Sequence, residues 1–114
     1  MDIKQLVGLV QGSTLSAPEM ERPLTCGYVC DLLSWVMARG QPGMAWVTVQ
    51  THLNVIAVAS LHEMACVILP DGIMMEEAVL QKAREEGIAV VTSPLSAYHI
   101  CGLMMGGGLP PPET

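Results

Sequence analysis

The sequence predicts a three-layer α/β domain with a mainly parallel sheet of about four to five strands and helices on both faces. Three segments, 44–49, 65–69 and 88–92, are almost wholly apolar, and segments with helical spacing alternate with them. Strands that are apolar on both sides are typical of parallel sheets covered by two helix layers. We therefore expect one domain over residues 1–105, followed by a flexible Gly/Pro tail over residues 106–114.

The first half of the chain alternates between clear and weak patterns. Apolar residues at helical spacing predict a helix over residues 3–10, with Asp2 near its start. Residues 14–24 contain two prolines and predict a loop, with one short strand near Leu15 and another over residues 24–29.

The middle of the chain is more regular. A helix is expected over residues 31–40, with Gly40 as its C-terminal cap, and a strand over residues 44–49. Residues 53–64 keep helical spacing but are apolar on more than one face, so this helix should be largely buried.

The second half predicts two more helices around the last two strands. Residues 76–86 form the clearest surface helix, with acids in the first turn and a Lys82–Glu86 pair at i, i+4 spacing. Ser96 is well placed to cap a last helix over residues 97–105.

Composition excludes several classes of protein. The net charge is −6 and the five lysines and arginines do not cluster, which argues against nucleic-acid binding. Apolar runs are too short to span a bilayer, and the N-terminus lacks the features of a signal peptide. We expect a cytoplasmic protein without membrane contact.

Four cysteines raise the question of a metal centre. In a cytoplasmic protein they should be reduced thiols rather than disulfides. Cys26 and Cys30 form a C-x3-C pair, so an iron–sulfur or zinc site stays open as an alternative. Cys66 and Cys101 each stand alone in their predicted elements, and we expect no metal and no cofactor.

Three enzyme signatures are absent from the sequence. It contains no G-x-x-x-x-G-K-[ST] phosphate loop, no G-x-G-x-x-G after a strand and no G-x-S-x-G. No catalytic residue is predicted, and we expect a protein that is not an enzyme.

A polar turn between a predicted strand and a predicted buried helix is the best candidate for a ligand site. It contains Gln50, Thr51, His52 and Asn54. Polar groups at the carboxyl edge of a parallel sheet and at a helix N-terminus favour binding of a small anion. The alternative is structural: Thr51 or His52 caps the helix and Gln50 satisfies the loop backbone.

Trp35 falls off the apolar stripe of its helix, beside Asp31 and Arg39. An exposed tryptophan marks an interface more often than a catalytic site. The alternative is a packed position at the edge of the helix. Together with the 51% apolar composition, an exposed Trp35 favours a homodimer.

Several blocks of the chain resemble the DRTGG domain family over roughly residues 1–105. The most specific block is residues 47–59, and residues 21–28, 31–37 and 82–88 also match. Of the motif that names the family, Arg22, Thr25 and Gly27 match, Glu21 replaces the aspartate and Cys26 replaces the first glycine.

The resemblance implies a fold like that of the N-terminal domain of HPr kinase, whose kinase chemistry belongs to a separate P-loop domain. Stand-alone relatives resemble proteins encoded near iron-only hydrogenase and NADH-dehydrogenase-like subunits, which makes such subunits expected partners. We expect a non-catalytic regulatory or assembly module that senses a small anionic ligand. The alternative is an iron–sulfur electron carrier or accessory subunit of a hydrogenase.

Overall fold

The computed structural model describes residues 1–113 and contains one five-stranded sheet in the order β1-β5-β4-β3-β2. Strands β2 to β5 are parallel, and β1 pairs antiparallel with β5. The predicted α/β class is confirmed. The elements are α1 (Ile3–Leu9), β1 (Ser13–Ser16), β2 (Cys26–Val29), α2 (Leu33–Arg39), β3 (Met44–Val47), α3 (Leu53–Leu61), β4 (Cys66–Leu69), α4 (Glu77–Glu85), β5 (Ala89–Thr92) and α5 (Ala97–Gly106).

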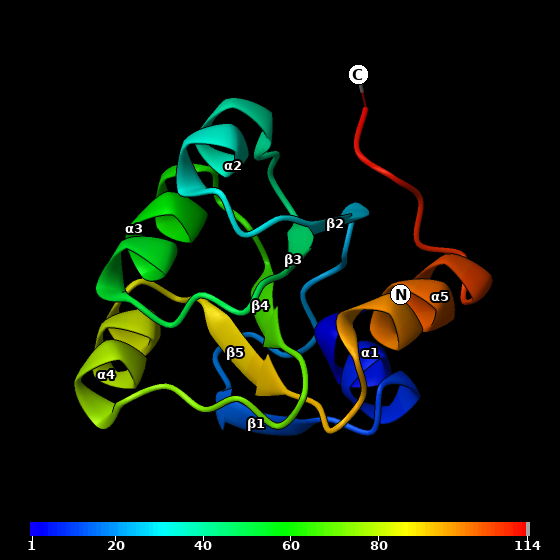
Figure 1. Cartoon of the computed structure of the whole chain (residues 1–114), viewed down its shortest axis with the longest axis horizontal. Helices are drawn as coiled ribbons and strands as arrows, with labels where there is room; N and C mark the ends of the chain where they lie inside the picture. The colour runs from blue at the N-terminus through cyan, green and yellow to red at the C-terminus, as the bar shows by residue number, and fades with distance from the viewer. Residues whose placement is uncertain (114) are drawn as a thin grey trace.

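Two helix layers enclose the sheet (Figure 1). Helices α2, α3 and α4 cover one face, while α1 and α5 cover the other. The parallel strands lie in sequential order, because each of the three crossover helices returns the chain to the next strand on the same face. This order never reverses, so the sheet lacks the crevice that a reversal of strand order opens in many nucleotide-binding folds.

The sheet's central strands, β3 and β4, are buried on both faces, as their continuous apolar sequences predicted. Trp46 is fully buried among the α2–α4 layer, and its indole N–H donates to the Cys30 carbonyl at 2.9 Å. The α1–α5 side is filled by aliphatic side chains such as Leu6 and Ile100. Each face thus has its own apolar core.

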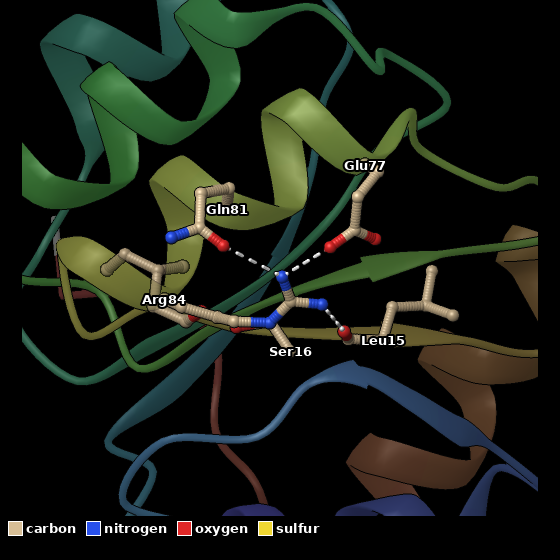
Figure 2. Close-up of polar contacts among 6 residues, drawn as sticks. Leu15, Ser16, Glu77, Gln81 and Arg84 are labelled. Atoms are coloured by element: carbon tan, nitrogen blue, oxygen red, sulfur yellow. Dashed lines mark hydrogen bonds and ion pairs between the residues drawn. The ribbon is translucent and has the colours of Figure 1, made fainter.

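Strand β1 contains a β-bulge between Thr14 and Ser16, which leaves the Leu15 carbonyl facing away from its neighbour. Arg84 of α4 donates to that carbonyl at 3.3 Å and pairs with Glu77 at 2.6 Å (Figure 2). The Ser16 hydroxyl donates a hydrogen bond to the Ile88 carbonyl at 2.9 Å. The Arg84 contact attaches the antiparallel edge strand to α4, and the Ser16 contact attaches it to the segment just before β5.

Two helices differ from the sequence prediction in detail. Helix α3 buries Val55, Ile56, Val58 and Ala59, but Leu53 and Leu61 are 46% and 67% exposed. The helix is therefore apolar on its solvent side as well, instead of being largely buried. Gly40 ends α2 with φ −58°, so it is not a left-handed cap. A larger residue at position 40 would clash, since an added Cβ would lie 2.5 Å from the His62 ring.

The sequence predicts a flexible Gly/Pro tail after α5, and in the structure part of this segment contacts the domain. Helix α5 continues to Gly106, and Leu109 is only 4% exposed. We call residues 107–113 the tail segment. It packs against the domain because Leu109 finds an apolar contact beside Met104 and Gly27. Thr114, the last residue of the predicted tail, lies outside the described residues.

Candidate functional site

The polar turn predicted as a ligand site lies between β3 and α3 at the carboxyl edge of the sheet. Val49, Gln50 and Thr51 form its first part, and His52 is the N-cap residue of α3. Strand β3 ends at Val47, and the next residue, the buried Thr48, donates its hydroxyl to the Asp31 carboxylate at 2.8 Å.

Asp31 organises this turn, and the sequence analysis did not identify it. Its carboxylate accepts from the Thr48 hydroxyl and from the Val49 N–H at 2.9 Å. Gln50 reaches back and donates its side-chain amide to the Asp31 carbonyl at 3.0 Å. Asp31 could have been found in the sequence, because it follows soon after one predicted strand. It therefore lies at the same sheet edge as the polar turn that follows the next strand. For Gln50, this contact agrees with the structural alternative to ligand binding, because its side-chain amide donates to a backbone carbonyl of a loop.

His52 is fixed by a hydrogen bond to the first turn of α3, the helix that it caps. Its Nδ1 accepts from the Asn54 N–H at 3.1 Å, which leaves Nε2 as the ring nitrogen available to donate. Thr51 and Asn54 make no side-chain hydrogen bond to any part of residues 1–113. The turn thus offers a donor at His52 and two uncommitted polar side chains.

A hollow of about 580 Å³ opens beside this turn. It is lined by the four turn residues from Val49 to His52 and by Leu53, and on the α4 side by Met74, Glu76 and Val79. Three of the four predicted ligand-binding residues border it; Asn54 does not. Glu76 introduces a negative charge, which repels a bare anion but accepts hydrogen bonds from hydroxyl or amino groups.

The motif residues lie at the opposite, amino-terminal edge of the sheet. The Arg22 guanidinium donates to the carbonyls of Glu63 and of Met64, the latter at 3.1 Å. The Thr25 hydroxyl donates to the Pro42 carbonyl at 2.6 Å. Glu21 is exposed and forms no ion pair with any of residues 1–113.

The motif therefore joins three loops rather than forming part of the polar turn. Arg22 links the segment before β2 to the end of α3, and Thr25 links it to the turn before β3. Gly27 lies within β2, where an added Cβ would crowd Met104 and Leu109 at 3.3–3.4 Å. The two groups of predicted residues are at opposite ends of the sheet, so they do not make one site.

Trp35 is 50% exposed on α2, as expected for a residue off the buried stripe. The Arg39 guanidinium lies 5.0 Å from the centre of its ring, within cation–π distance. The pair borders a hollow of about 500 Å³ together with Tyr28 and the tail segment.

The four cysteines are divided between the two faces of the sheet. Cys26 and Cys30 pack with the α2–α4 side, whereas Cys66 and Cys101 pack with the α1–α5 side. All four are free thiols. Across residues 1–113, no three Cys, His, Asp or Glu residues gather closely enough to hold a metal ion.

The buried thiol of Cys66 should make stability depend on alkaline pH. Burial raises its pKa from the ordinary 9.0 to about 12, an effect that the Arg22 charge only partly offsets. The unfolded chain loses this proton first, so stability is full below pH 9.0 and falls as pH rises toward about 12. Urea unfolding between pH 8 and 11 measures it. We expect a steeper fall in the wild type than in Cys66→Ala, and equal slopes would contradict the assignment.

No known protein-family model matches the sequence, and no curated protein matches it. A solved structure does: the CBS and DRTGG domains of the regulatory region of Clostridium perfringens pyrophosphatase, complexed with its activator, diadenosine tetraphosphate. The TM-score is 0.77 at 13% sequence identity over 96% of this chain. The match spans 47% of that solved chain, about half its length. The likeness shows that the fold is DRTGG-like. Within residues 1–113 no helix has the length and apolar character needed to cross a membrane.

Proposed function

We propose that this chain is a non-catalytic regulatory or assembly module that senses a small ligand carrying a phosphate or carboxylate. The observation that carries the proposal is the likeness of nearly the whole chain to part of a regulatory region that was solved with a nucleotide activator. The fold supplies the framework, and the polar turn before α3 supplies the candidate site.

The groups around the turn favour a nucleotide or sugar phosphate over a bare anion. The first turn of α3 presents its Leu53 N–H, and His52 adds a donor at Nε2, both suited to a phosphate or carboxylate. Glu76 on the far side of the hollow suits a hydroxyl or an amino group instead. A ligand with both kinds of group satisfies both sides.

A thermal-shift screen tests this proposal. Inorganic phosphate, ATP, diadenosine tetraphosphate and sugar phosphates are added to the wild type and to a His52→Ala/Gln50→Ala variant. A ligand at about 100 times its Kd adds about 2.7 kcal/mol to the free energy of unfolding, a clear rise in melting temperature. We expect this rise in the wild type and its loss in the variant. A ligand that stabilises both proteins equally binds elsewhere.

The assembly part of the proposal is a homodimer formed through the α2 surface around Trp35. Light scattering is expected to give twice the mass of one chain for the wild type and the mass of one chain for Trp35→Ala. Tyr98→Ala is the matched control, because Tyr98 is 91% exposed on α5 in the other helix layer. A wild-type mass near 12.2 kDa at all concentrations would contradict the dimer.

The resemblance to stand-alone DRTGG proteins supports hydrogenase or NADH-dehydrogenase-like subunits as the partners that such a module would regulate or assemble. Affinity capture of the tagged chain from its native host, with Trp35→Ala as the comparison, tests this partner class. Absence of these subunits from the captured proteins would remove it.

A further inference from the structure

The tail segment lies along the outer edge of β2, which is the last strand on that side of the sheet within residues 1–113 (Figure 1). The Gly27 N–H donates to the Pro110 carbonyl at 2.9 Å, as a neighbouring strand would require. Proline has no N–H and cannot return such a bond from positions 110–112. The edge is therefore occupied by a segment that makes only part of the possible pairing.

Backbone contacts hold the end of the tail segment as well. The Gln41 side-chain amide donates to the Glu113 carbonyl at 2.6 Å, and its oxygen accepts from the Glu113 N–H at 3.2 Å. Both contacts, like the one from Gly27, are made to the peptide backbone. They use no side chain of the tail segment, so they would also hold another segment whose backbone follows the same course.

The tail segment also fills its groove poorly. A hollow of about 340 Å³ remains on the α5 side, where Val29 and Met105 are 48% and 59% exposed. Another of about 500 Å³ remains on the α2 side, beside Trp35 and Arg39. The prolines border both hollows without filling them, whereas a bulky apolar side chain would bury these exposed surfaces. Arg39 adds a positive charge that suits an acidic residue.

We propose that the outer edge of β2 is a docking site for an extended, proline-rich segment of a partner protein that carries a bulky apolar residue and an acid. The chain's own tail segment is the intramolecular competitor for this site. Extended proline-rich segments lose little entropy on binding and suit grooves with aromatic walls, here supplied by Tyr28 and Trp35. A segment bound beside Trp35 competes with the proposed dimer, which uses the same surface. The tether keeps the competitor at an effective concentration of about millimolar, so it masks the site until a better-fitting segment arrives.

The test measures binding of a fluorescent peptide, Gly-Leu-Pro-Leu-Pro-Glu-Thr, to the full chain by anisotropy. This peptide is residues 108–114 with leucine in place of the middle proline. The affinity of the peptide for the wild type is compared with its affinity for a variant that carries Pro110→Gly, Pro111→Gly and Pro112→Gly. Those substitutions loosen the competitor without removing a buried side chain. We expect the variant to bind roughly tenfold more tightly or better.

Gln41→Ala in the loosened variant is the matched control and should weaken binding, while Tyr98→Ala should not. The proposal is overturned by an absence of saturable binding to the loosened variant, or by equal binding to its Gln41→Ala form. If the triple substitution prevents a cooperative melt, Pro112→Gly alone answers the same question. A wild-type dimer that the glycine substitutions convert to a monomer would assign the groove to the tail of a second copy, which also overturns the proposal.

Discussion

Replacement of Trp46 by alanine should lower the free energy of unfolding by about 3–5 kcal/mol, a large share of the total for a domain of this size. Trp46 is fully buried in β3 and contacts the layer of α2, α3 and α4. Its truncation removes that apolar burial, leaves a cavity and deprives the Cys30 carbonyl of its indole donor. Urea denaturation measures the change.

Trp35→Ala is the matched control for this prediction. Trp35 is half exposed, with the Arg39 guanidinium over its ring, so its truncation should cost less than about 1 kcal/mol when both proteins are unfolded at a concentration low enough for the wild type to be a monomer. Comparable losses from both tryptophans would contradict the division between a core residue and a surface residue. The same variant then serves the dimer test, because its fold is preserved.

Gly43→Ala should destabilise the domain by about 2–4 kcal/mol. Gly43 has φ +77°, a left-handed conformation that costs an alanine about 1–2 kcal/mol. Its added Cβ would also lie 2.6 Å from the Thr25 methyl group and 2.8 Å from the hydroxyl. Thr25 cannot easily move away, since its hydroxyl bonds the Pro42 carbonyl.

Gly72→Ala separates these two costs. Gly72 has φ +70° but nothing within 4 Å of the added Cβ, so it should show only the backbone cost. Thermal or urea unfolding of both variants, and of Gly43→Ala combined with Thr25→Ala, tests the steric part. Equal effects of Gly43→Ala and Gly72→Ala would mean that the motif threonine does not constrain the turn before β3.

Much of the fold was predictable because its strands have a simple pattern. Segments 67–69 and 89–91 are apolar throughout and alternate with helices. This pattern is typical of a parallel sheet that is covered on both faces. The antiparallel β1 was weakly signalled, since a strand of Ser13–Ser16 is short, polar and bulged. Its place at the sheet edge depends on Arg84 and Ser16, and a distant arginine leaves no local pattern.

The polar turn was predictable as a location, but its internal contacts were not. Strand–turn–helix spacing placed Gln50 and His52 at the carboxyl edge of the sheet. The role of Asp31 depends on two strands lying side by side, which their separation in sequence does not reveal. The contact of the tail segment with the domain was not predictable for a related reason: glycine and proline exclude a regular element, yet they do not prevent an irregular segment from packing through Leu109.

The most direct test of the proposed function is a map of amide chemical shifts during titration with diadenosine tetraphosphate or ATP. Our account predicts that the largest changes occur at the amides of residues 50–55 and near Glu76 at the start of α4, and that His52→Ala/Gln50→Ala abolishes them. The tail segment and the amino-terminal edge of the sheet around Arg22 should remain unchanged. Changes confined to that edge or to the tail segment, or no changes with any of the screened ligands at millimolar concentration, would contradict it.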